Sequence, residues 1–176
     1  NIGKIAADRA IGLKMRVMVF DPFLTAEIAA KNGVELVTKE KLFERADYIT
    51  VHVPLNDSTR NLINKNTIET MKTGVRIINC ARGGIVNESD LIEGLDSGKI
   101  AGAAIDVFEE EPPPQDNPLL KHDSVICTPH LGASTAEAQV NVAVQVAEQI
   151  RDYLISGEIR NSLNCPSISS EMVKVL

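Results

Sequence analysis

Three kinds of side chain that together can bind an acid and move its proton lie in the second half of the chain. Arg82 follows an apolar run at residues 75–78, His130 follows another such run, and the acids of residues 109–111 lie between them beside prolines. A guanidinium binds a carboxylate through two parallel hydrogen bonds, and an imidazole exchanges protons near neutral pH. The combination predicts an enzyme that acts on an anionic substrate.

Each of these residues also has an ordinary structural interpretation when it is taken singly. The arginine suits a surface cation or a helix-cap partner, the imidazole after Pro129 suits a turn, and the acids suit a solvated charge run. His52, inside a strand-like run, and His122, in a polar loop, are interpreted as structural. The enzymatic interpretation therefore depends on the motifs occurring together and in order.

Length and composition set the broad class. The 176 residues suit one domain, and with 3% aromatic residues and no Trp the core must be aliphatic. The net charge of −6, with mixed signs along the chain, argues against nucleic-acid binding, which needs a basic stripe. No membrane span is expected, since there is no run of about 18 apolar residues, and the N-terminus does not resemble a signal peptide.

The three cysteines, Cys80, Cys127 and Cys165, are odd in number and widely spaced. This pattern argues against a metal site and against a disulfide framework, and it favours a reducing, cytoplasmic location. Arg82 lies close enough in sequence to lower the pKa of the Cys80 thiol, but a small buried residue at a strand end is the preferred interpretation.

Apolar β-branched runs alternate with segments of helical period. Strands are predicted at Arg16–Phe20, Tyr48–Val53, Val75–Asn79, Ala101–Val107 and Ser124–Thr128. Helices are predicted at Lys4–Leu13, Ala26–Asn32, Lys39–Arg45, Lys65–Met71, Glu88–Leu95 and Ser134–Ile155, the last two capped by Asn87 and Ser134. Nearly continuous apolar strands indicate a parallel sheet covered on both faces, so the fold class is α/β, a Rossmann-type doubly wound parallel sheet.

The beginning of the chain resembles the second half of a dinucleotide-binding loop. Gly3 precedes a helical segment, and Asp21 follows at nearly the spacing of about 20 residues expected for an acid that binds the ribose. A first strand and two earlier glycines are therefore expected before residue 1. Residues 1–157 are interpreted as the dinucleotide-binding domain, and residues 158–176 as a connector.

Three motifs in this order resemble the NAD-binding domain of the D-2-hydroxyacid dehydrogenase family: Asn79–Val86, Gly102–Pro112 and Pro129–Thr135. The resemblance extends from residue 1 to about residue 168. Ala136–Gln139 and Asn164–Ser167 are most similar to the members that oxidise 3-phosphoglycerate to 3-phosphohydroxypyruvate with NAD⁺, in serine synthesis. The family resemblance implies that Arg82 binds the substrate carboxylate and that His130 is the acid/base. It also implies that Glu111 orients the imidazole and favours its protonated form. Glu109 and Glu110 are rival candidates for that carboxylate.

The resemblance also implies a cofactor site for NAD and no metal. Asp21 would bind the adenosine ribose and, by repelling a 2′-phosphate, would favour NAD over NADP. The other expected cofactor contacts are Asn1, Ile2 and Gly3 at the pyrophosphate, Val53 and Pro54 at the adenine, Cys80, Ala81, Arg82 and Asp106 at the nicotinamide, and Gly132 and Ala133 beside His130.

Several alternatives remain open at this level. A sibling dehydrogenase acting on glyoxylate, hydroxypyruvate or D-lactate would keep the same three catalytic residues. An NAD-sensing transcriptional corepressor is a non-enzymatic alternative, and formate dehydrogenase is disfavoured because it has glutamine where Glu111 stands.

The apolar stripe of residues 134–155 suits docking on the sheet or a subunit interface, and the resemblance implies a homodimer or homotetramer. The chain by itself is expected to be inactive, because it lacks a substrate domain.

Overall fold

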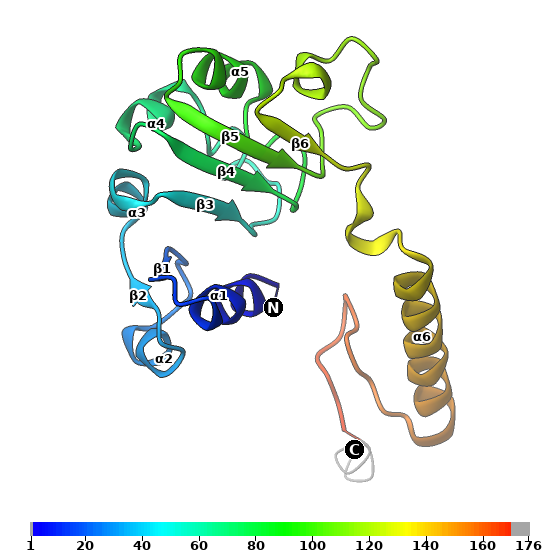
Figure 1. Cartoon of the computed structure of the whole chain (residues 1–176). Helices are drawn as coiled ribbons and strands as arrows, with labels where there is room; N and C mark the ends of the chain where they lie inside the picture. The colour runs from blue at the N-terminus through cyan, green and yellow to red at the C-terminus, as the bar shows by residue number, and fades with distance from the viewer. Residues whose placement is uncertain (1, 170–176) are drawn as a thin grey trace. The chain divides into compact units, whose positions relative to one another are not determined.

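The computed structural model describes residues 2–169 as helices and strands that alternate along the chain (Figure 1). The helices are α1 (Ile2–Gly12), α2 (Ala26–Lys31), α3 (Lys39–Arg45), α4 (Lys65–Thr70), α5 (Glu88–Asp96) and α6 (Ala136–Ser156), with 3₁₀ turns η1 (Pro118–Lys121) and η2 (Leu131–Ala133). The strands are β1 (Met18–Val19), β2 (Glu35–Leu36), β3 (Tyr48–Val51), β4 (Val75–Asn79), β5 (Ile100–Ile105) and β6 (Val125–Cys127).

Every pairing between these strands is parallel, which confirms the predicted α/β class with a Rossmann-type parallel sheet. β3, β4, β5 and β6 form one sheet in that order, and β1 and β2 form a separate pair. Within residues 2–169, no strand joins β1 to β3. A strand before residue 1 stays a prediction.

The core lies between the four-stranded sheet and helices α3, α4 and α5, which follow one another along one side of it (Figure 1). Its most completely buried apolar side chains are Ile63, Val75, Ile77, Ile85, Leu91, Ile100 and Leu119. On the opposite face Tyr48 and Arg76 are exposed, with the guanidinium 5.4 Å from the ring centroid. The expectation of strands buried on both faces is therefore wrong for β3 and β4, which alternate between buried and exposed residues.

The chain divides into two compact units, Asn1–His130 and Leu131–Leu176. The first contains all six strands. The second contains α6 and a segment in which Ile159 and Ile168 form an antiparallel bridge. The domain boundary expected after residue 157 stays a prediction.

Short elements and caps are where the predicted bounds fail. The strand expected at Arg16–Phe20 is paired only over β1, and its partner β2 was not predicted, because two residues carry no readable periodicity. Asn87 caps α5 as predicted. The cap of α6 is Thr135 rather than Ser134, since the Thr135 hydroxyl accepts the amide of Ala138.

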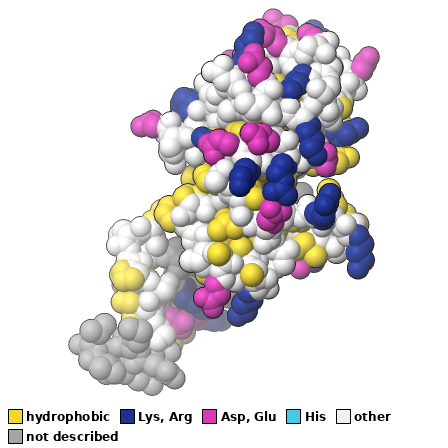
Figure 2. All heavy atoms as spheres, turned by 90° about the vertical axis from the view of Figure 1, so that its left-hand side faces the viewer, with side chains coloured by type: hydrophobic (Ala, Val, Ile, Leu, Met, Phe, Trp, Pro, Cys, Tyr) yellow, Lys and Arg dark blue, Asp and Glu magenta, His cyan; other side chains and the backbone are white. Residues whose placement is uncertain are grey.

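The surface carries both signs of charge. In Figure 2, Lys and Arg side chains are interspersed with Asp and Glu side chains on the visible face. Within residues 2–169, no helix combines the length and apolarity that crossing a bilayer requires. In the same part of the chain, His, Cys, Asp and Glu form no group of three or more able to hold a metal ion.

Candidate active site

The carboxyl ends of β4, β5 and β6 lie side by side. The register pairs Asn79 with Ile105 and Ile105 with Cys127, so the next residue of each strand begins a loop at the same edge of the sheet. Main-chain bonds extend this alignment by one residue, because Asp106 N donates to Asn79 O at 3.0 Å and Thr128 N donates to Ile105 O at 3.0 Å. Parallel α/β sheets bind their ligands at this edge.

A buried amide shapes the loop after β4. The Asn79 side chain is 2% exposed, and its Oδ1 accepts the amide of Ala81 at 3.1 Å while its Nδ2 donates to the carbonyl of Arg82 at 3.0 Å. The turn is thereby fixed from inside the protein, and the Arg82 side chain stays exposed. Its Nη1 donates to Ala81 O at 2.6 Å, which leaves other guanidinium donors for an anion.

The acid and the imidazole predicted to act together are in contact. Glu111 Oε2 lies 2.7 Å from His130 Nδ1, and Glu111 Oε1 accepts the amide of Phe108 at 3.1 Å. His130 has a φ of +53°, a left-handed conformation in which histidine is enriched among non-glycine residues. Among the described residues, Glu111 is the carboxylate bonded to this ring, not its neighbours Glu109 and Glu110.

This contact determines which ring nitrogen is available for chemistry. With Nδ1–H donated to Glu111, Nε2 is the nitrogen left to exchange a proton with a substrate. The hydrogen bond from His130 is the main reason that the pKa of the Glu111 carboxyl lies below its ordinary value, with the Phe108 amide acting in the same direction. Partial burial and the charge of Asp106 oppose this shift.

The loops after β4 and β5 touch at a glycine. A Cβ atom added to Gly83 would lie 1.7 Å from the carbonyl oxygen of Phe108 and 2.9 Å from the amide nitrogen of Glu109. No side chain fits there without a shift of backbone. The loop of Arg82 and the loop of Glu111 are therefore positioned by direct main-chain contact.

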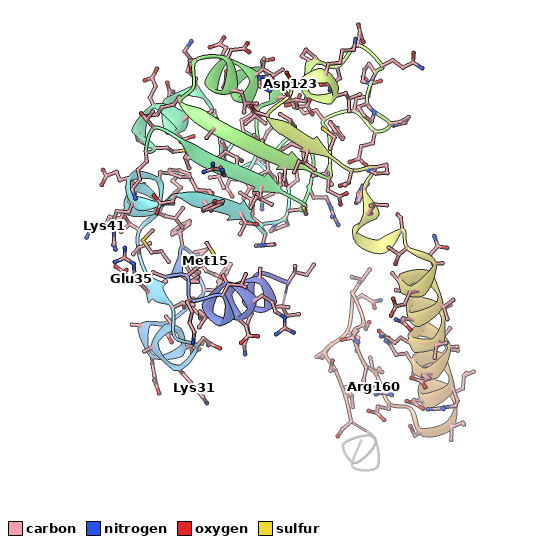
Figure 3. All side chains as sticks on the ribbon, viewed as in Figure 1. Met15, Lys31, Glu35, Lys41, Asp123 and Arg160 are labelled. Carbon is pink, nitrogen blue, oxygen red and sulfur yellow. The ribbon has the colours of Figure 1, made fainter. Side chains whose placement is uncertain are left out.

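A cavity lies beside Asp21, the acid predicted to bind the adenosine ribose. This cavity of about 620 Å³ opens beside the ends of β1 and β2, lined by Phe20, Asp21, Glu35, Leu36, Val37, Thr38, Lys39, Glu40, Lys41 and Arg45. Figure 3 labels Glu35 and Lys41 on this side of the molecule. Arg45 donates two hydrogen bonds to Glu35, of 2.7 and 3.0 Å. This ion pair neutralises one of the cations that line the cavity.

Comparison with known proteins decides the family. Residues 1–132 match the family model described as D-isomer specific 2-hydroxyacid dehydrogenase, NAD binding domain. The chain belongs to this family. It is 52% identical over 171 residues to D-3-phosphoglycerate dehydrogenase of Bacillus subtilis (strain 168), covering 97% of the chain and 32% of that protein. It is 48% identical to D-3-phosphoglycerate dehydrogenase of Archaeoglobus fulgidus, covering 96% and 32%.

The solved structures agree. A glyoxylate reductase from Paecilomyes thermophila aligns with a TM-score of 0.82 at 31% identity, over 93% of this chain and 49% of that one. The chain therefore spans about a third of the curated relatives and about half of this structural neighbour.

The residues of this NAD-binding domain fit the cofactor of its family. Asp21 is exposed at the end of the β1 segment and uses Oδ1 to accept the amide of Phe23 at 2.8 Å, so Oδ2 faces no partner among the described residues. That oxygen is available to ribose hydroxyls. At the start of α1, a Cβ on Gly3 would lie 3.3 Å from the Cβ of His52, so a larger residue would crowd the helix N-terminus, where a pyrophosphate binds.

The other predicted cofactor residues divide into three groups. Val53 and Pro54 follow β3, whereas Cys80, Ala81 and Asp106 lie in the loops after β4 and β5, as expected for the cofactor edge. Gly132 and Ala133 belong to η2 in the second unit, so their place beside the cofactor stays a prediction. Asn1 lies outside the described residues.

One of these residues, Cys80, differs from expectation. Cys80 is exposed as a residue, whereas the sequence favoured a buried one. Partial desolvation of its thiol and the nearby charge of Asp106 raise the pKa of Cys80, whereas Arg82 was considered as a cause of a lower pKa. Asp106 is 5% exposed, and its Oδ1 accepts the hydroxyl of Thr128. His52 and His122 make local contacts, to Thr50 and to Ser124 respectively.

Sequence reasoning missed the residues that support the site from behind. Asn79, Gly83 and Thr128 were seen only as parts of motifs, and Glu88 only as the first residue of a helix. Their functions depend on contacts between loops far apart in the sequence, for which one sequence holds no signal. The glycine pair at residues 83–84 was the one available hint of a close approach.

Gly83→Ala should damage the site, because the new methyl group collides with main chain of the Glu111 loop. We expect a loss of kcat/KM on the order of 100-fold, the size associated with displacements of about 1 Å at catalytic groups. The matched control is Gly12→Ala at the end of α1, where an added Cβ meets nothing within 4 Å. Steady-state kinetics of the intact protein test this, and equal effects of the two changes would contradict it.

Glu111 should titrate below the value of roughly 4.3 for a free glutamate. Because its pKa is lowered in the folded state, the stabilisation from its hydrogen bonds is complete above that ordinary value and is lost as the pH falls through the lowered one. Carboxyl-detected NMR titration measures this shift. In His130→Gln the Glu111 pKa should rise, and a Glu111 that titrates identically in both proteins would exclude the bond.

Asp21→Ala should weaken NADH binding by about 10- to 100-fold, the range for hydrogen bonds to a charged group. NADPH binding should weaken less or improve, because the change also removes a negative charge near the 2′-phosphate. Fluorescence titration with both cofactors gives the ratio. Lys39→Ala at the same cavity is the control, and an unchanged NADH to NADPH ratio in Asp21→Ala would exclude ribose recognition by Asp21.

Proposed function

We propose that the chain is the cofactor-binding and catalytic domain of a D-3-phosphoglycerate dehydrogenase, which oxidises 3-phospho-D-glycerate to 3-phosphohydroxypyruvate in serine synthesis. The observation that carries the proposal is the contact of 2.7 Å between Glu111 and His130, at the sheet edge where Arg82 also lies. The identity of 52% to the Bacillus subtilis enzyme supports this substrate. The chain spans about a third of that enzyme, so the activity is assigned to the whole protein.

In the proposed reaction Arg82 binds the substrate carboxylate and so places the C2 hydroxyl near His130. Nε2 of His130 takes the hydroxyl proton as the C2–O bond becomes a carbonyl. When bound, NAD⁺ supplies the acceptor for the hydride that leaves C2. Glu111 holds Nδ1 and stabilises the positive charge that the ring acquires. In the reverse direction His130 must begin protonated and return its proton to the oxygen.

The proposed protein is a cytoplasmic homodimer or homotetramer. α6 supports an oligomer, because it exposes a series of apolar side chains at Val140, Val142, Val144, Val146 and Ile150. Two of them, Val146 and Ile150, line a cavity within the second unit together with Ile159. Val140, Val142 and Val144 do not line this cavity, and we propose that they contact another subunit.

The substrate is tested by following NADH oxidation by the intact protein with 3-phosphohydroxypyruvate, hydroxypyruvate, glyoxylate and pyruvate. We expect kcat/KM to be about 100-fold or more higher for 3-phosphohydroxypyruvate than for the other three acids. A site that binds the substrate phosphate discriminates strongly against acids that lack it. His130→Ala should lower turnover by about 10²- to 10⁴-fold and leave NADH binding intact. A preference for an unphosphorylated acid would assign the protein to a sibling dehydrogenase, and NADH binding without turnover would favour a binding protein.

A further inference from the structure

Glu88 bridges two points of the loop that carries Glu111. It is the first residue of α5, and its Oε1 accepts the amide of Glu109 at 2.7 Å. Its Oε2 accepts Nδ2 of Asn117 at 2.9 Å. Glu109 and Asn117 lie on opposite sides of Glu111 in the sequence, so a single carboxylate holds both ends of the segment.

Beyond Glu109, which lies against Gly83, the loop has few other means of being held. Pro112, Pro113 and Pro114 have no amide hydrogen to donate. Within the described chain, the only hydrogen bond of residues 109–116 that joins two main-chain atoms runs from Asn117 N to Pro114 O, and it is internal to the loop. Side-chain acceptors therefore have to fix its position, and Glu88 supplies both oxygens.

Both ends of this bridge are anchored in the core. Asn117 also caps η1 by accepting the amide of Leu119, whose side chain is 1% exposed. On the other side, α5 begins at its cap Asn87 and buries Leu91 completely. Glu88 therefore links a rigid helix to the loop at a position where a negative charge is favourable, the first turn of a helix.

We propose that Glu88 is a positioning residue for the Glu111–His130 pair. By holding the loop at Glu109 and Asn117, it keeps Glu111 Oε2 within hydrogen-bond distance of His130 Nδ1. The inference rests on the proposed function for its kinetic consequence. Its structural part, the effect of Glu88 on the Glu111 contact, is measured without turnover.

The charged groups that bear on the pair come from three elements. Glu111 lies on the proline loop, and Asp106 at the end of β5 acts on Glu111 through its charge. Glu88 reaches the loop from α5. A shift in the pH profile after a change at Glu88 therefore has to be compared with that of a variant of Glu111 itself.

The test is Glu88→Gln in the full-length protein. The amide keeps the size of the side chain but replaces one acceptor oxygen with a donor, so it can satisfy only one of the two bonds. We expect kcat for ketoacid reduction to fall on the order of 10-fold. The loss of rate with rising pH should begin at a lower pH, as in Glu111→Gln, because the protonated imidazole is less well stabilised. The double variant should show less than the sum of both effects.

The matched control is Asp90→Asn, which makes the same change of carboxylate to amide in the first turn of α5. Its Oδ2 accepts the amide of Lys65 at 2.8 Å, away from the Glu111 loop. We expect a similar change in stability and an unchanged pH profile. Where Glu88→Gln does not fold, Asn117→Asp replaces the Nδ2 donor to Glu88 with an acceptor while an oxygen remains to cap η1, and it should shift the pH profile in the same direction.

A second readout separates this inference from the proposed function. In Glu88→Gln, NMR titration should show the pKa of Glu111 rising toward its ordinary value, whether or not the protein turns over any acid. If the wild-type protein reduces none of the tested ketoacids, the proposed function fails and the titration still decides the role of Glu88. A wild-type Glu111 titration together with a wild-type pH profile in Glu88→Gln would overturn the positioning role.

Discussion

The parallel register of β4, β5 and β6 is the constraint on which the candidate site depends. Because Asn79, Ile105 and Cys127 are aligned, the three following loops start at one edge of the sheet. Each loop then brings one chemical group: a guanidinium, a carboxylate or an imidazole. A slip of one residue in β5 would turn Asp106 from its buried position and carry the Glu111 loop away from His130.

Rigid contacts between the loops turn this common origin into a defined geometry. The Asn79 side chain fixes the turn before Arg82, and Gly83 lets that turn touch the main chain of Phe108. Neither contact involves a side chain that we propose to be catalytic. The positions of the proposed catalytic groups nevertheless depend on them. A side chain on a flexible loop samples many positions, and confining it to one costs entropy.

The sequence predicted the parts of the structure that depend on local pattern. The parallel fold, the helix at Lys39–Arg45 and the strand at Val75–Asn79 follow from apolar periodicity. The cap of α5, Asn87, follows from capping chemistry. Strand β2 was missed because two residues are held by pairing with β1 and not by their own preference. The roles of Arg82, Glu111 and His130 were predicted from their motifs and the family resemblance and stay predictions. The contacts of Glu88 and Gly83 with the neighbouring loop are long-range and could not be predicted in this way.

The choice of Glu111 over its two acidic neighbours shows why position decides more than residue type. Glu109, Glu110 and Glu111 are the same residue type, and in the sequence they differ only in their distance from the prolines. In the fold, Glu111 accepts from both Phe108 and His130, so its charged form is stabilised and its pKa is lowered. It therefore stays ionised throughout the neutral range. Glu111 is then a charged acceptor for His130 Nδ1–H in that range, and His130 is the group that exchanges the proton in the proposed reaction.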